Sequence, residues 1–299
     1  MDRLSTLRLF TRLAQLQSFS ATAAELEISA SAASKAIAEL EQSLGAKLLH
    51  RTTRRVSLTE VGAGYAARAA AVLRAMEDAD AEAAGAAGAA SGRLRLNAPM
   101  ALGLADLGEA LAAFAAAHPR VELDVEFGDR HVDLLQEGFD LGLRATTDPK
   151  DSSYTAQRIA EFALHVCASP GYIARHGRPG SPNELGAHAC FSYAYATAGA
   201  RWPLHHAGQT HVSVTPAMRA NSTPFLKRLV LADLGIAVLP DFVAQPEFGA
   251  GALVELFPET KRPPLRLYAV YPDRRLAPRK VVACVQFLKQ WFGTRPPDS

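Results

Sequence analysis

Apolar residues near the start of the chain recur with the period of an α-helix. Leu9 or Phe10, Leu13 and Leu16 fall on one face and predict a first helix that ends near Gln17. The apolar pattern breaks there and then resumes twice, so a short second helix and a longer third helix are expected. The chain is therefore predicted to begin with a small bundle of helices.

Serine residues mark the expected starts of the second and third helices. Ser20 is predicted to cap the second helix and Ser29 or Ser31 the third, because a serine hydroxyl accepts a hydrogen bond from an unpaired backbone N–H. Gly45 suits the left-handed residue that closes the third helix. The core face of that helix is predicted at Ala33, Ile37, Leu40 and Leu44.

The opposite face of the third helix is small and polar where the helix starts, at Ala30, Ser31, Ser34 and Lys35. Small residues allow close approach, which is typical of a recognition helix that enters the DNA major groove by its N-terminal turn. Residues 48–50 and 56–58 then predict two short strands joined by a basic turn. Together these elements predict a winged helix-turn-helix, and its arginines are expected on phosphates or in the minor groove. These wing residues are Arg51, Arg54 and Arg55.

An alanine-rich segment follows the predicted hairpin. Thr59 is expected to cap a helix that carries Tyr65, Val72, Leu73 and Met76, and the sequence AAGAAGAASG then forms a hinge. A flexible low-complexity tether is the alternative, but the apolar stripe of residues 59–82 favours the helix.

From Arg93 onward, strand and helix patterns alternate. Residues 93–98, 121–127 and 139–144 predict strands with helices between them, and the pattern restarts at residues 163–169. A last strand at 265–271 and a closing amphipathic helix complete the chain. This order predicts mostly parallel sheets covered by helices, arranged as two α/β lobes joined by two crossing strands, as in periplasmic-binding-protein folds.

These patterns predict three domains in the 299 residues. Residues 1–58 form the winged helix-turn-helix, 59–91 the linker helix and hinge, and 92–299 an effector-binding domain. Its first lobe spans about 92–162 plus 267–299 and its second about 163–266.

Charge is unevenly distributed along the chain. The 32 Lys and Arg nearly balance the 30 Asp and Glu, yet the stretch between Glu41 and Glu60 holds no acid and four basic residues. This local excess favours binding to nucleic acid. No secretory signal or membrane-spanning run is evident, and the three cysteines suggest no disulfide framework, so a cytoplasmic location is expected.

The segment SFSATAAELEISASAASKAIAELEQSLGAKLLHRTTRRVSLTEVG resembles the DNA-binding domain of LysR-type transcriptional regulators, and its wing LLHRTTRR resembles the CrgA-like subgroup. GRLRLNAP, FDLGLR, ASPGYI and LADLGIAVLP extend the resemblance more weakly across the rest of the chain. Two positions depart from the family: Ala30 stands where many relatives have Gln, and Thr22 where many have Ala.

The resemblance implies a bacterial transcription factor that binds double-stranded DNA. It also implies that the linker helix pairs with a second copy and that strand 121–127 helps to build a homotetramer from two dimers. RNA polymerase is a further partner that the resemblance suggests, and no membrane partner is expected.

A small-molecule effector is expected between the two lobes, beyond the ends of strands and near helix starts. The resemblance places a hydroxyl that holds an effector carboxylate at the position of Met100, so an apolar or aromatic effector, with or without a carboxylate, is the hypothesis. A simple helix cap is the alternative for Ser222, and a surface ion pair for Arg144. The candidate effector residues are Met100, Ala101, Arg144, Thr146, Thr147, Ser222 and Thr223.

The same residues give less support to other classes of function. No phosphate loop, nucleophile elbow or catalytic carboxylate pair is evident, so no catalytic residue, metal ligand or cofactor is predicted. A metal sensor using His205, His206 and His211, a redox sensor using Cys167 and Cys190, and a transport binding protein are less favoured. An effector-independent or redox-sensing regulator of the same family remains the alternative.

Overall fold

The computed structural model describes residues 1–51, 56–83, 90–147, 154–196, 201–205, 208, 210–272 and 277–294. The chain divides into two compact units. One comprises residues 1–92 and 132–140, and the other residues 93–131 and 141–299.

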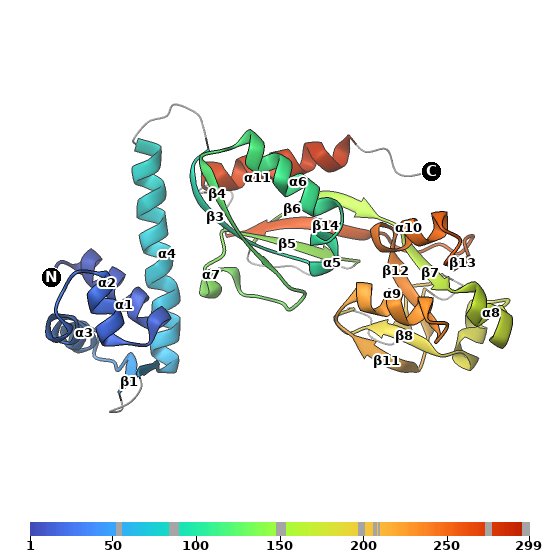
Figure 1. The fold of residues 1–299 in the computed structure, drawn as a ribbon, viewed down its shortest axis with the longest axis horizontal. Coiled ribbons are helices and arrows are strands. Elements are labelled where there is room, and N and C mark those ends of the chain that lie inside the picture. Colours follow the sequence, from blue (N-terminus) through green and yellow to red (C-terminus); the bar gives the residue numbers. More distant parts are fainter. Residues whose placement is uncertain are drawn as a thin grey trace. The chain divides into compact units, whose positions relative to one another are not determined.

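The first unit contains three packed helices, a hairpin and a long helix (Figure 1). These are α1 (Arg3–Leu16), α2 (Phe19–Glu25), α3 (Ala30–Leu44), β1 (Leu49–Arg51), β2 (Val56–Leu58) and α4 (Glu60–Ala83). Their core is formed by the predicted apolar stripes, with Phe10, Leu13, Ile37 and Leu40 almost completely buried. Residues 132–140 carry the short helix α7 (Leu134–Glu137) and contact α4.

Hydrogen bonds to caps define where these helices begin and end. Ser29 caps α3, and Gly45 closes it with φ of 64°, as expected. The prediction that Ser20 caps the second helix is wrong, because Ser18 accepts the hydrogen bond from the Ala21 N–H. The Ser20 hydroxyl lies 3.1 Å from the Ser18 hydroxyl instead.

The second unit contains two five-stranded sheets, which we call the first and second lobes (Figure 1). In the first lobe the strand order is β4 (Val121–Phe127), β3 (Gly92–Ala98), β5 (Leu141–Thr146), β14 (Leu265–Tyr271) and β6 (Thr155–Phe162). β3 and β5 are parallel, whereas β14 is antiparallel to both of its neighbours. The helices of this lobe are α5 (Met100–Gly103), α6 (Asp106–Ala117) and α11 (Arg279–Gly293).

The second lobe has the strand order β11 (Pro216–Ala220), β8 (Cys190–Tyr193), β12 (Ile236–Pro240), β7 (Leu164–Ala168) and β13 (Val254–Leu256). Its other elements are α8 (Pro170–His176), a 3₁₀ helix at Pro182–Ala187, β9 (Arg201–Trp202), β10 (Val212–Ser213), α9 (Thr223–Leu231) and α10 (Asp241–Gly249). The chain passes from the first lobe to the second at Ala163, between β6 and β7, and returns before β14.

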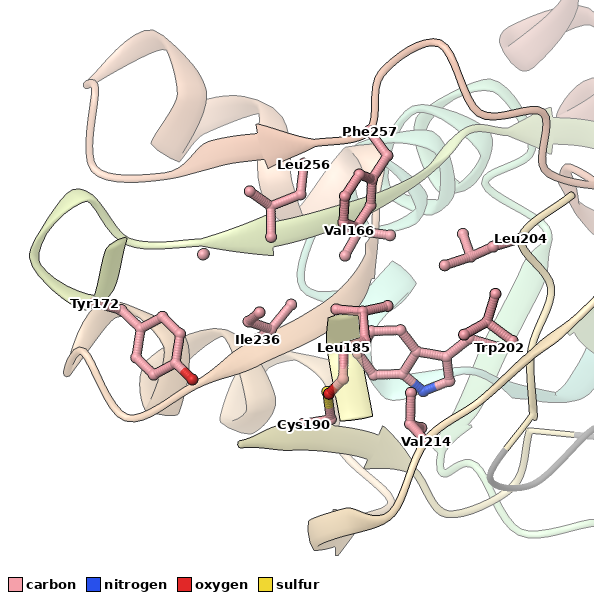
Figure 2. Packing of buried hydrophobic residues seen from close by; sticks show 12 residues of the cluster. Val166, Tyr172, Leu185, Cys190, Trp202, Leu204, Val214, Ile236, Leu256 and Phe257 are labelled. Atoms are coloured by element: carbon pink, nitrogen blue, oxygen red, sulfur yellow. The ribbon is translucent and has the colours of Figure 1, made fainter. Parts of the chain in front are cut away.

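Two apolar clusters pack against the second lobe's sheet. One cluster gathers Tyr172, Leu185, Cys190 and Trp202, as Figure 2 shows. The other contains Cys167 and Phe191 together with residues of α9 and α10. Ala101 of α5, which belongs to the first lobe, is buried in this second cluster.

Candidate DNA-binding and effector sites

The N-terminal turn of α3 presents the small surface that the sequence predicted. Ala30, Ser31 and Lys35 are exposed, and Ser34 is half-buried. The Lys35 ammonium lies 3.9 Å from the Glu39 carboxylate, and both side chains are largely exposed. A surface ion pair of this kind contributes little to stability, so Lys35 can leave Glu39 and bind a DNA phosphate.

The wing is only partly within the described residues. β1 and β2 pair antiparallel, with Leu49 opposite Leu58 and Arg51 opposite Val56. Arg54 and Arg55 lie outside the described residues, and of Arg51 only the backbone is described. The predicted role of these three arginines therefore stays a prediction.

A buried carboxylate fixes the base of the wing to the recognition helix. Glu41 of α3 is only 3% exposed, and its Oε1 accepts hydrogen bonds from the N–H of Leu48 at 2.9 Å and of Leu49 at 3.2 Å. Its Oε2 accepts from Lys47 Nζ at 3.0 Å. Burial acts to raise the pKa of Glu41, but the hydrogen bonds from Lys47, Leu48 and Leu49 outweigh it and lower the pKa. Glu41 thus remains ionised and holds β1 against α3.

The start of α4 is joined to the same point. The Thr59 hydroxyl donates to the Lys47 carbonyl at 2.7 Å and accepts from the Gly62 N–H at 2.9 Å, which confirms Thr59 as a cap. A Cβ on Gly62 would stand 1.9 Å from the Leu48 carbonyl oxygen, so only glycine fits there. Glu41 of α3 and Thr59 at the start of α4 both hydrogen-bond to Lys47 and Leu48. These two residues therefore join the wing, α3 and α4 at one place, which we call the anchor. Sequence reasoning did not assign this role to Glu41.

The first-lobe part of the expected effector site surrounds the start of α5. Met100 is exposed, and its N–H donates to Asp129 Oδ1 at 3.2 Å. Tyr193, at the end of β8 in the second lobe, lies close enough to Asp129 to affect its pKa. Burial raises the pKa of Asp129, although the Met100 N–H and the nearby Tyr193 hydroxyl act to lower it. Neither Asp129 nor Tyr193 was predicted, because only the folded lobes bring them together.

Arg144 lies on β5, the central strand of the first lobe's sheet. Its Nη1 donates to Asn97 Oδ1 at 2.7 Å and to the Leu143 carbonyl at 2.9 Å. Asn97 is fully buried, and its amide donates to the Glu126 carbonyl at 3.1 Å. The hydrogen bond to Asn97 therefore links Arg144 to the segment just before α5, because Asn97 lies three residues before Met100.

The remaining candidates lie at strand and helix ends. Thr146 ends β5, and Thr147 follows it; both are half-buried. Ser222 is the N-cap of α9 and accepts from the Phe225 N–H at 3.3 Å, which favours its alternative interpretation as a helix cap. Thr223 is the first residue of α9. Tyr193 lies near Ser222 and Thr223, because it pairs with Ala220 of β11, two residues before Ser222.

The three thiols are poorly suited to rapid oxidation. Cys167, Cys190 and Cys284 are all buried and unpaired. Burial raises the pKa of all three, to about 12 for Cys190 and for Cys284. Cys167 and Cys190 belong to different apolar clusters of the second lobe. Of the candidate metal ligands, His205 is exposed, His211 is half-buried and His206 lies outside the described residues.

Comparison with known proteins identifies both parts of the chain. Residues 4–63 match the family described as bacterial regulatory helix-turn-helix protein, lysR family, and residues 87–293 match the LysR substrate binding domain. An uncharacterized HTH-type transcriptional regulator of Haemophilus influenzae is 35% identical over 282 residues, which cover 94% of this chain and 98% of the relative.

CrgA of Neisseria meningitidis is similar in sequence and in structure. This HTH-type transcriptional regulator, from a serogroup C strain, is 31% identical over 288 residues, which cover 96% of each protein. The solved structure of CrgA from N. meningitidis matches with a TM-score of 0.60 at 30% identity, covering 96% of this chain and 98% of CrgA.

The chain therefore belongs to the LysR family and is a LysR-type transcriptional regulator. The predicted family, its CrgA-like relationship and the two-part fold are confirmed. Within the described part of the chain, no helix combines the length and the apolar character needed to cross a membrane.

Proposed function

We propose that this regulator reads a specific DNA sequence with the N-terminal turn of α3 while its wing contacts the phosphate backbone. The observation that carries this proposal is the exposed surface of Ala30, Ser31 and Lys35 at the start of α3. The hydrogen bonds of Glu41 to the Leu48 and Leu49 N–H groups hold the wing against the same helix. Ala30 offers only a methyl group, which suits contact with a thymine methyl rather than a hydrogen bond to a base. No enzymatic activity is part of the proposal, and the cytoplasm is its expected location.

The proposed DNA-bound form is a dimer of dimers. Val61, Val72 and Met76 of α4 are 58%, 53% and 43% exposed, so α4 carries an apolar surface that a second α4 could cover. β4 lies at the edge of its sheet and exposes Glu122 and Glu126, consistent with the role proposed for this strand in a homotetramer. RNA polymerase is the further partner expected of a transcriptional regulator.

The proposed signal is a small molecule at the start of α5, where Met100 and Ala101 lie near Tyr193 of the facing lobe. We infer an apolar or aromatic body for this effector, because Met100 replaces the expected hydroxyl with an apolar side chain. Arg144, Thr146, Thr147, Ser222 and Thr223 complete the proposed site. An effector-independent regulator is the second candidate, and the hydrogen bond from the Met100 N–H to Asp129 within the protein favours it.

Selection from a random pool of DNA duplexes tests the DNA-binding proposal. The full chain should enrich two half-sites related by two-fold symmetry and centred about one helical turn, or a multiple of it, apart. Ala30→Glu should abolish enrichment, since it adds a negative charge to the exposed first turn of α3. Gln42→Glu is the matched control, because it adds the same charge to an exposed position near the other end of α3. No enrichment by the unmodified chain, or equal enrichment by Ala30→Glu, would overturn the proposal.

A further inference from the structure

The two segments that cross between the lobes differ in length. The first crossover is Ala163 alone, which lies between the last residue of β6 and the first residue of β7. The second crossover spans residues 257–264, from the end of β13 to the start of β14. A free segment of that length would let the two lobes take many relative orientations, because the span of a flexible chain grows with its length.

Arg262 fastens most of the second crossover to the second lobe. Its side chain is only 9% exposed. Its Nη1 donates to the Leu164 carbonyl at 2.7 Å and to Glu255 Oε1 at 2.8 Å. Its Nη2 donates to the Phe257 carbonyl at 2.5 Å and to the Leu256 carbonyl at 3.3 Å. The rigid guanidinium thus joins the second crossover to β7 and β13.

The residues before Arg262 in the second crossover are also held by the second lobe. Phe257 is buried in the cluster that Figure 2 shows, and its carbonyl accepts from the Thr260 N–H at 3.0 Å. The Lys261 carbonyl accepts from the N–H of His205, which follows β9, at 3.1 Å. Residues 257–262 are therefore part of the second lobe in structural terms.

Two prolines make up the rest of the second crossover. Pro263 and Pro264 lie between Arg262 and the start of β14. Neither has a backbone N–H with which to bond to either lobe. A pocket of about 280 Å³ lies beside them and is lined by residues 161–164 together with Thr260, Arg262 and Pro264. The two crossovers therefore border one open space.

The first crossover is held by the second lobe as well. The Ala163 N–H donates to Asp241 Oδ2 at 3.2 Å, and the Asp241 N–H donates to the Ala163 carbonyl at 3.0 Å. Asp241 is the first residue of α10. The ring of Phe162 lies 5.0 Å from that of Phe242 in α10 and 5.9 Å from that of Phe292 in α11. The border between the lobes in this segment thus falls between Phe162 and Ala163.

We propose that Arg262 restricts the lobes to one hinge, formed by the junction of Phe162 and Ala163 and by Pro263 and Pro264. Arg262 is a positioning residue, because it keeps residues 257–262 with the second lobe and leaves only the prolines to bend. Two-lobed domains commonly close by rotation at a few such residues. This inference goes beyond the proposed function, since it needs neither an effector nor DNA.

The distance between the lobes can be measured by pulsed electron–electron double resonance on the full chain without DNA. Spin labels at Ala116→Cys in α6 and Ala174→Cys in α8 report on the first and second lobe, and both positions are exposed. The three native thiols are buried, so labelling favours the introduced cysteines. An excess of unlabelled chain restricts the signal to distances within one chain.

Glycine substitutions on the two sides of Arg262 test where the second crossover bends. Pro263→Gly together with Pro264→Gly should broaden the distance distribution, because glycine frees the backbone that proline fixes. Pro258→Gly is the matched control, since Pro258 is exposed but lies in the part that Arg262 holds. It should leave the distribution unchanged. Equal broadening by Pro258→Gly and by the double variant would overturn the hinge.

Removal of Arg262 tests its role directly. In Arg262→Ala the free part of the second crossover grows from the two prolines to residues 257–264, so the distribution should broaden about twofold, as the square root of segment length predicts. Arg178→Ala is the matched control, because Arg178 also donates to β13, at the Glu255 carbonyl, but lies outside both crossovers. It should not broaden the distribution.

A distribution in Arg262→Ala as narrow as in the unmodified chain would overturn the role of Arg262. Thermal melting shows whether this variant is folded. The glycine comparison retains Arg262 and therefore decides the position of the hinge even if Arg262→Ala unfolds. Since the assay contains neither DNA nor effector, a failure of the DNA-binding proposal would be seen separately in the duplex selection.

Discussion

Replacement of Glu41 should disconnect the wing from the recognition helix. In Glu41→Ala, the N–H groups of Leu48 and Leu49 lose their acceptor inside a site where the glutamate is 3% exposed. Each buried donor left without a partner costs about 1–3 kcal/mol, so for the two donors a loss of about 2–6 kcal/mol is expected in the free energy that opens this hairpin. The ion pair with Lys47 contributes little to this free energy, because the Lys47 side chain is 81% exposed.

Hydrogen exchange of the Leu48 and Leu49 amides in the full chain measures this loss directly. Glu41→Gln should cost less than Glu41→Ala, because its amide oxygen can still accept from both N–H groups. Glu39→Ala is the matched control on the same helix, since Glu39 is largely exposed and its ion pair is with the exposed Lys35. It should change the opening free energy by less than about 0.5 kcal/mol. Unchanged protection of both amides in Glu41→Ala would refute the anchor.

The same anchor has a predictable pH dependence. The pKa of Glu41 in the folded chain is lowered from its ordinary value of 4.5. Its contribution to stability is therefore fully present above about pH 4.5 and is lost as the pH falls through the lower, folded-state pKa. Glu41→Gln should remove this part of the acid sensitivity of the hairpin, as exchange measured across that pH range would show.

The remaining predictions concern backbone packing and the thiols. Gly62→Ala should destabilise the first unit by more than about 1 kcal/mol, because its Cβ would meet the Leu48 carbonyl at 1.9 Å, whereas Gly64→Ala, with nothing within 4 Å, should be neutral or stabilise α4 by up to about 1 kcal/mol. Thermal melting of the two variants checks this, and equal melting temperatures would contradict it. A thiol-reactive dye should label the folded chain slowly and the urea-unfolded chain rapidly, because Cys167, Cys190 and Cys284 are buried with raised pKa values. Rapid labelling of the folded chain would instead support a redox sensor.

The helical part of the fold was predictable because its determinants are local. The spacing of Ile37 and Leu40, the left-handed Gly45 and the cap at Thr59 all act within a few residues of sequence. Ser20 misled the prediction because Ser18 and Ser20 can both cap a helix. Ser18 is the cap in the folded unit, so the helix begins at Phe19, which packs against the core.

Long-range contacts could not be predicted in the same way. The sequence gives no sign that Glu41 turns inward to the amides of Leu48 and Leu49, because its neighbours Glu39 and Gln42 are exposed. Asp129 and Tyr193 come from separate lobes, so the influence of one on the pKa of the other depends on how the sheets are placed rather than on any local motif.

The salt dependence of binding to duplex DNA tests the central claim most directly. Logarithmic affinity should fall linearly with logarithmic salt concentration, with a slope of about 0.9 for each phosphate that the protein neutralises. Replacing Arg51, Arg54 and Arg55 together by Ala should therefore weaken binding to every sequence and reduce the slope by about 2.7 if each arginine contacts one phosphate. An unchanged slope in the triple variant would contradict a wing that binds the DNA backbone.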